Sequence, residues 1–111
     1  MKIKNHKLQG GVKYKESPNH GGEFAPDTII IHYTAGPSAE SAINTFADPD
    51  KKVSAHLIVD FNGSITQMAP FNTVAWHAGK SRHKDRIGLN NYAIGIEIVN
   101  AGRLTRSGSK Y

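Results

Sequence analysis

Two ionisable side chains lie within apolar segments of this 111-residue chain, and both could take part in acid–base or metal chemistry. His32 ends the run "TIIIH", residues 28–32, and Glu97 lies in "IGIEIV", residues 94–99. An imidazole can act as a general base or as a metal ligand, and a carboxylate can exchange a proton with water. Placing either group among isoleucines costs free energy unless the group is paired or functional.

Each residue also has a purely structural interpretation. His32 can be a hydrogen-bonded core residue, and Glu97 can face water from an edge strand. Strand alternation places Glu97 on the same face as Gly95, which leaves room for another group to approach. Because ligands gather beyond the carboxyl ends of strands in α/β sheets, His32 is a candidate base or ligand.

Two further histidines have different settings. His56 has apolar neighbours and is expected to be buried and hydrogen-bonded. Trp76 and His77 lie in "WHAG", where an aromatic ring, a histidine and small residues are typical of a substrate-binding wall. The chain has no cysteine and no HExxH, HxH or CxxC pattern. Any metal would therefore need His and carboxylate ligands from distant segments, a set that suits zinc among other ions.

The secondary structure predicted around these residues indicates an α/β fold with a mixed sheet flanked by helices. Residues 28–33 and 93–100 are apolar and predict strands. Residues 38–47 predict an amphipathic helix with Ser38 as its N-cap, because apolar residues recur at i, i+3, i+4 and i+7. A hairpin over 53–70 is predicted to turn at Asn62-Gly63 in a type I′ turn.

The remaining segments carry turn signals rather than periodicity. Residues 1–26 are expected to be an irregular N-terminal segment. Residues 71–92 read as a long loop, which in a compact domain is usually functional or disordered. The tail after residue 100 is basic and loose.

The composition is that of one small globular domain, with 38% apolar and 21% charged residues. No apolar run is long enough to span a membrane, and the basic N-terminus lacks the apolar segment of a secretory signal. The net charge of +5 is explained either by solubility or by attraction to a polyanion such as nucleic acid or a cell-wall polymer. No nucleic-acid-binding motif is present, so nucleic acid is not expected as a partner.

Four segments occur in the order and at the spacing of a known family: "TIIIHYTAG", "SAHLIVDFNGSITQMAP", "VAWHAGKS" and "NNYAIGIEIVN". Together they resemble the zinc-dependent N-acetylmuramoyl-L-alanine amidases of the type 2 group, which includes the peptidoglycan recognition proteins. The resemblance covers roughly residues 27–100. It implies a bacterial or phage origin and leaves the compartment open.

The resemblance implies a role for particular residues. His32 corresponds to the first zinc ligand, with Zn²⁺ as the cofactor, and Glu97 to the catalytic carboxylate. The substrate-binding residues would be Trp76, His77, Tyr33 and Asn91. Ala55 stands where some relatives have a catalytic tyrosine, so the proton transfer would fall to Glu97.

The family's second zinc-binding histidine, and the aspartate or cysteine that follows it, lie downstream of the glutamate strand and have no counterpart here. Residues 27–111 are therefore expected to be the N-terminal part of a single amidase domain. A further segment or a second chain would complete it.

The implied reaction is hydrolysis of the amide between N-acetylmuramic acid and the L-alanine of the stem peptide. Peptidoglycan or a released muropeptide would be the substrate. The alternatives are a module that binds muropeptides without cutting them, or an inactive fragment without a full zinc site.

Overall fold

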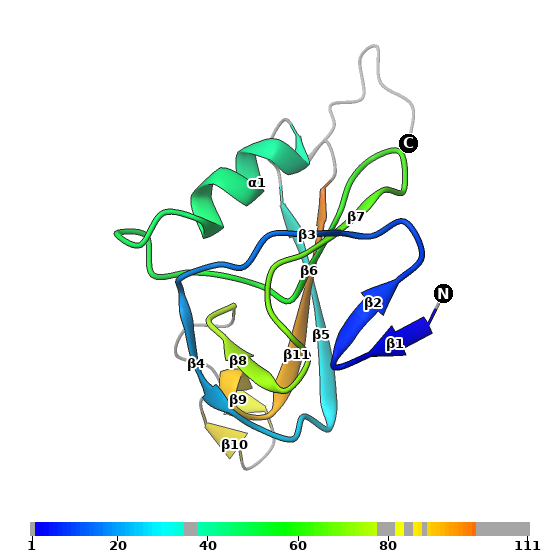
Figure 1. Cartoon of the computed structure of the whole chain (residues 1–111). Helices are drawn as coiled ribbons and strands as arrows, with labels where there is room; N and C mark the ends of the chain where they lie inside the picture. Colours follow the sequence, from blue (N-terminus) through cyan, green and yellow to red (C-terminus); the bar gives the residue numbers. More distant parts are fainter. Residues whose placement is uncertain (1, 35–37, 78–81, 84–85, 88, 100–111) are drawn as a thin grey trace, which may run out of the picture.

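A mixed sheet of five strands forms the centre of the protein, described here from a computed structural model (Figure 1). The structure describes residues 2–34, 38–77, 82–83, 86–87 and 89–99. In spatial order the strands are β3 (Lys13–Tyr14), β7 (Ile65–Gln67), β6 (Leu57–Val59), β11 (Ala93–Val99) and β5 (Thr28–Thr34). Strand β11 runs parallel to both of its neighbours, whereas β6 and β7 are antiparallel. The predicted mixed sheet is confirmed.

One helix, α1 (Ala39–Phe46), packs against one face of this sheet. Its apolar side meets a small core formed with Ile58, Met68 and Val99. The Ser38 side chain accepts a hydrogen bond from the Ser41 backbone N–H, which confirms the predicted N-cap. Within the described residues α1 is the only α-helix. The prediction of a sheet flanked by helices is therefore confirmed for one face of the sheet. No described helix is long and apolar enough to cross a membrane.

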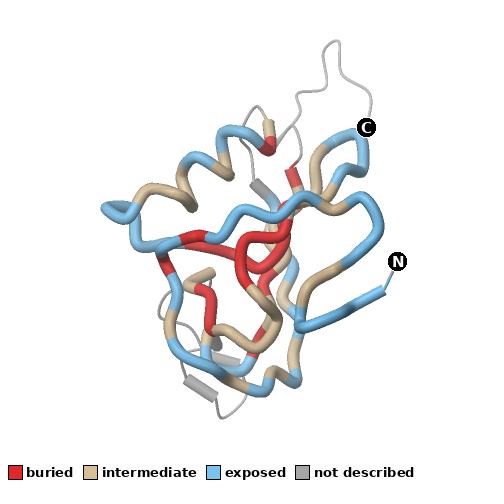
Figure 2. Tube along the Cα trace, in the orientation of Figure 1, coloured by how far each residue is buried: buried red, intermediate tan, exposed pale blue. Residues whose placement is uncertain are grey.

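The opposite face of the sheet is apolar and partly open to solvent. Exposed and intermediate residues alternate along β5 (Figure 2). The parallel register sets Ile29, Ile31 and Tyr33 of β5 beside alternate isoleucines of β11. These three side chains are 63%, 50% and 68% exposed. The hairpin of β1 (Lys2–Lys4) and β2 (Lys7–Gln9) borders an apolar cavity of about 410 Å³ on this face.

The N-terminal segment is more regular than its turn signals suggest. Besides β1, β2 and β3, it contains β4 (His20–Glu23), which pairs with β8 (Thr73–Ala75). The expectation of irregular structure over residues 1–26 is therefore wrong for these strands. They are two to four residues long and mostly exposed, so they carry no hydrophobic period, and β4 depends on a partner remote in sequence. The domain boundary itself stays a prediction.

The segment read as a loop, residues 71–92, also contains short elements. Besides β8 these are β9 (Arg82–His83), β10 (Arg86–Ile87) and the 3₁₀ helix η1 (Leu89–Asn91). Strands β9 and β10 pair with each other in a two-stranded sheet. The predicted strand end at Asn100 and the tail of residues 101–111 lie outside the described residues.

The hairpin of β6 and β7 is confirmed, but its turn is not type I′. That turn requires positive φ at both central residues, and Gly63 has φ +87° whereas Asn62 does not have positive φ. The Gly63 N–H instead donates to the Asp60 carbonyl and the Asp60 N–H to the Ser64 carbonyl, both at 2.9 Å. This pattern is a type I turn followed by a left-handed glycine, the usual three-residue hairpin loop.

Candidate active site

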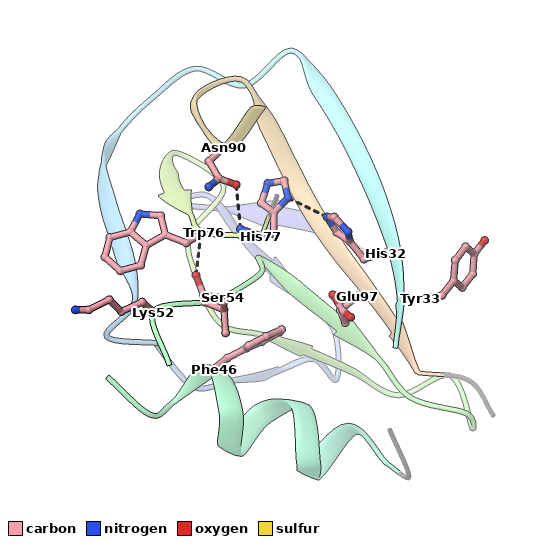
Figure 3. A pocket seen from close by; sticks show the side chains of 10 residues that line it. His32, Tyr33, Phe46, Lys52, Ser54, Trp76, His77, Asn90 and Glu97 are labelled. Carbon is pink, nitrogen blue, oxygen red and sulfur yellow. Dashed lines mark hydrogen bonds between the residues drawn. The ribbon is translucent and has the colours of Figure 1, made fainter. Parts of the chain in front are cut away.

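A cavity of about 650 Å³ opens on the face of the sheet that carries α1 (Figure 3). Strands β5 and β11 form its floor, and the end of α1 and the segments before β6 and after β8 form its walls. Its lining combines aromatic, apolar and ionisable side chains, namely His32, Tyr33, Phe46, Lys52, Val53, Ser54, Trp76, His77, Asn90 and Glu97. A concave site with a few convergent polar groups is the usual form of a small-molecule site.

His32 and Glu97 are neighbours in this cavity. The parallel pairing of β5 and β11 sets them at the same register position, so both side chains point from the same face of the sheet. Both are half-buried. Burial raises the pKa of the Glu97 carboxyl, and the nearby His32 opposes that rise. A carboxyl with a raised pKa in a cavity is a candidate for acid–base chemistry, and for Glu97 this role stays a prediction.

His77 lies over the paired strands β5 and β11 and contacts both. Its Nδ1 lies 3.1 Å from His32 Nε2, and its Nε2 lies 3.0 Å from the Ala93 carbonyl oxygen of β11. Its backbone N–H donates to the Asn90 side-chain oxygen at 3.0 Å. Burial lowers the pKa of the His77 imidazole, which favours the neutral ring.

His56 is a structural residue, as its apolar neighbours predict. The side chain is fully buried, and Nδ1 accepts a hydrogen bond from the Gly95 N–H at 3.0 Å. Its Nε2 donates to the Thr73 carbonyl at 2.6 Å. Burial lowers the pKa of His56 to about 4. Both ring nitrogens are occupied, so His56 links β11 to β8 and has no lone pair left for a ligand.

Trp76 is held in the cavity wall by Ser54. The Ser54 N–H donates to the Trp76 carbonyl at 2.9 Å, and the Trp76 N–H donates to the Ser54 hydroxyl at 3.0 Å. The same hydroxyl donates to the Asn19 carbonyl. The Asn19 amide group in turn donates to the carbonyls of Phe46, Asp48 and Val53, which fixes the segment after α1.

The predicted substrate-binding residues divide into two groups. Trp76 and His77 line the cavity as expected. Tyr33 reaches the cavity's edge, but its side chain points away from the other lining residues, on the opposite face of the sheet (Figure 3). Asn91 is exposed in η1 and is not among the lining residues, whereas its neighbour Asn90 is. The structure therefore brings Asn90, rather than Asn91, into the cavity.

Several lining residues were not found from the sequence. Ser54, Lys52 and Phe46 carry no motif that distinguishes them from ordinary loop or helix residues. Lys52 has a positive φ of 53°, which is uncommon for a residue with a side chain and is not visible in a sequence. The adjacent pair of asparagines at 90–91 signalled the right segment, but a 3₁₀ turn decides which of the two faces inward.

The described residues do not by themselves form a complete zinc site. A catalytic zinc takes three protein ligands and a water. Among the described residues, no group of three or more His, Cys, Asp or Glu side chains could hold a metal. Both His77 nitrogens are hydrogen-bonded, while His32 has an Nδ1 without a partner in the described part of the chain. His32 and Glu97 are thus the available donors near the cavity.

Comparison with known proteins agrees with the resemblance in the sequence. Residues 22–111 match the family model of N-acetylmuramoyl-L-alanine amidase. The chain is 39% identical over 90 residues to the amidase AmiD of Escherichia coli, covering 75% of this chain and 32% of that protein. It is 38% identical to the 1,6-anhydro-N-acetylmuramyl-L-alanine amidase AmpD of Escherichia coli over an alignment of 121 positions. That alignment covers 91% of this chain and 66% of that protein.

Solved structures of the same group share the fold. A crystal structure of AmpD superposes with a TM-score of 0.76 at 26% identity, covering 90% of this chain and 66% of that one. AmiD from E. coli, in complex with the substrate anhydro-N-acetylmuramic acid-L-Ala-D-γ-Glu-L-Lys, superposes with a TM-score of 0.63 at 36% identity. That match covers 79% of this chain and 36% of that one.

The chain spans between about a third and two thirds of the length of these curated relatives. The family model nevertheless matches most of the chain, including the strands that carry His32 and Glu97. The protein therefore belongs to the N-acetylmuramoyl-L-alanine amidase family.

Proposed function

We propose that this protein acts on peptidoglycan or a soluble muropeptide and hydrolyses the amide that joins N-acetylmuramic acid to the L-alanine of the stem peptide. The observation that carries the proposal is the pairing of His32 with Glu97 on parallel strands at the floor of the cavity. Family membership supplies the reaction class.

Glu97 is assigned the proton transfers. In its ionised form the carboxylate accepts a proton from the attacking water, and it then delivers that proton to the departing L-alanine nitrogen. Its raised pKa suits both steps, because a base whose pKa lies closer to neutral pH also serves as the acid. Hydrolysis breaks the C–N bond and forms a carboxylate on the lactyl group and a free amine on the peptide.

The walls of the cavity suit an amphipathic substrate. Trp76 and Phe46 offer apolar surface to a sugar ring or peptide, and Lys52 supplies a cation. The substrate in the AmiD complex carries a free α-carboxylate on its γ-linked D-Glu unit, and a cation at the cavity's edge would attract such a group. The net charge of +5 acts in the same direction.

Zinc remains the expected cofactor, with His32 as one ligand and the other ligands supplied from outside the described residues. A zinc ion would act as a Lewis acid on the scissile carbonyl. Metal analysis of the purified chain tests this, with His32→Ala as the matched variant. Zinc bound by the parent chain and lost from the variant supports the assignment, and equal zinc in both contradicts it.

Cleavage of a defined muropeptide tests the function. The chain is incubated with anhydro-N-acetylmuramyl-tripeptide and Zn²⁺, and free tripeptide is measured by mass spectrometry. Release of tripeptide that is roughly 10²- to 10⁴-fold slower in Glu97→Gln supports an amidase. Binding of the muropeptide by calorimetry without release supports the alternative, a non-hydrolytic binding module.

A further inference from the structure

The contact between His32 and His77 has a defined direction. His77 Nε2 lies 3.0 Å from the carbonyl oxygen of Ala93, and a carbonyl oxygen can only accept a hydrogen bond. Nε2 therefore carries a proton. In a neutral ring the other nitrogen, Nδ1, then has a lone pair and can only accept.

This assignment determines which tautomer a neutral His32 ring adopts. Its Nε2 lies 3.1 Å from the accepting Nδ1 of His77 and must donate the hydrogen of that bond. A neutral His32 with a proton on Nε2 carries its lone pair on Nδ1. Nδ1 makes no hydrogen bond to any described residue, and the ring lines the cavity (Figure 3).

Gly95 makes this arrangement possible. A Cβ atom placed on Gly95 would lie 2.3 Å from His77 Cγ and 2.5 Å from its Cδ2, which is closer than real Cβ contacts. The imidazole of His77 therefore lies directly on the backbone of β11. Any larger residue at position 95 would displace the ring from both Ala93 and His32.

We propose that His77 is a positioning residue: anchored on the Ala93 carbonyl and seated on Gly95, it fixes the tautomer and orientation of His32 so that Nδ1 presents the lone pair at the cavity. The interaction chain runs from β11 through His77 to β5. It explains why a histidine, rather than an apolar residue, follows Trp76 in the cavity wall. Groups that orient a functional histidine through its second nitrogen are a common requirement of such sites.

The tautomer of His32 is measured directly by two-bond ¹H–¹⁵N correlation spectra of the metal-free full chain, labelled on histidine. In the parent chain we expect one pattern for His32, with a protonated Nε2 and a lone pair on Nδ1. In His77→Phe, which keeps a ring but has no acceptor, we expect a mixture of both tautomers. In His77→Asn, whose amide oxygen can replace Nδ1, we expect the parental pattern to return.

Two results would overturn the proposal. One is a proton on Nδ1 of His32 in the parent chain, a measurement that needs no variant and so does not depend on variant folding. The other is an unchanged His32 pattern in a folded His77→Phe.

The consequence for catalysis rests on the proposed function and is tested separately. We expect kcat/KM for muropeptide cleavage to fall roughly 10- to 100-fold in His77→Phe and to recover in His77→Asn. A fixed tautomer in a chain without cleavage activity would refute the proposed function and leave the positioning role intact. Cleavage by a parent chain with mixed tautomers would refute the positioning role alone.

Discussion

Glu97 and His32 meet because two parallel strands place them at one register position. The half-buried setting raises the pKa of Glu97, and His32 beside it moderates the rise. At the scale of single residues, the site is a carboxyl and an imidazole on a shared floor, with a second imidazole holding the first. That set can move a proton to and from a bound water.

Glu97→Gln tests the carboxyl. We expect kcat to fall roughly 10²- to 10⁴-fold, because the amide side chain keeps the shape but cannot accept the proton. In the parent chain, kcat/KM should fall as the pH drops through the raised pKa of Glu97, since the base must be ionised. Steady-state kinetics across pH measure both effects.

The matched control is Glu23→Gln, which makes the same change in charge on the exposed strand β4. It should leave both kcat and the acid limb unchanged. An acid limb that persists at the same pH in Glu97→Gln would contradict the assignment.

The buried His56 should make the free energy of unfolding depend on pH. Its folded pKa of about 4 lies below the ordinary value of 6.5, so the unfolded chain binds the proton first as the pH falls. Stability from this group is complete above about pH 6.5 and is lost as the pH falls toward 4. The loss amounts to about 3 kcal/mol. Urea unfolding at a series of pH values measures it.

His56→Asn is the comparison, because its side-chain oxygen can still accept from Gly95 while no imidazole titrates. The drop in its free energy of unfolding over this pH range should be smaller than in the parent chain. His77, also with a lowered pKa, contributes a remaining part in both proteins. Parallel pH profiles for the two proteins would contradict the prediction.

The site was predictable where it depends on strand alternation. Glu97, His32 and the Trp76-His77 wall follow from apolar runs and from a resemblance carried by four segments. Asn90 and Ser54 did not follow, because their roles depend on a single 3₁₀ turn and on hydrogen bonds between remote segments. Tyr33 was expected in the site, but alternation along β5 turns it to the opposite face.

At the scale of elements, Asn19 joins the N-terminal segment to the cavity wall. It is 2% exposed, and its amide nitrogen lies 3.0 to 3.2 Å from three carbonyl oxygens on either side of the turn after α1. Removing the amide takes away all three hydrogen bonds, although the Phe46 carbonyl keeps the Ser17 hydroxyl and the Asp48 carbonyl keeps the Lys51 N–H. The segment of residues 46–53, which includes Phe46 and Lys52 of the wall, depends on this contact.

Asn19→Ala should therefore lower the free energy of unfolding by about 1–3 kcal/mol. It should also raise KM more than it lowers kcat, because the wall shifts while Glu97 remains in place. Denaturant unfolding and steady-state kinetics measure the two effects. Asn91→Ala, at an exposed position, is the control and should leave stability unchanged. A stable Asn19→Ala with the parental KM would contradict this role.

The elements also show how far sequence patterns reach. Strong local signals mark the helix, its Ser38 cap, the two long strands β5 and β11, and the hairpin of β6 and β7. The structure contains all of them. The short strands β1 to β4 have none, because their pairing partners supply their structure. The type I′ turn was wrong since Asn-Gly also fits a three-residue loop in which only the glycine needs positive φ.

At the scale of the whole molecule, the two faces of the sheet differ. One carries α1 and the cavity, and the other presents a row of exposed apolar side chains on β5. In the described sheet β5 is also an edge strand. Exposed apolar edges of this kind favour association.

We expect the isolated chain to bind a hydrophobic dye and to associate at high concentration. The double variant Ile29→Thr with Ile31→Thr should reduce both, because threonine keeps the strand preference and removes apolar surface. Dye fluorescence and sedimentation velocity measure this. Phe61→Thr, which changes an exposed ring in the hairpin turn, should alter neither. Equal reductions in both variants would contradict a role for this face.

The central claim is that the cavity around His32 and Glu97 hydrolyses the muramyl–L-alanine amide. The most direct measurement is cleavage of a defined muropeptide in ¹⁸O-labelled water, with mass spectrometry of both products. The account predicts one ¹⁸O atom in the lactyl carboxylate of the sugar product and an unlabelled free amine on the peptide. It also predicts product formation roughly 10²- to 10⁴-fold slower with Glu97→Gln. Label at a peptide carboxylate or at the sugar's anomeric carbon, or equal product from Glu97→Gln, would contradict it.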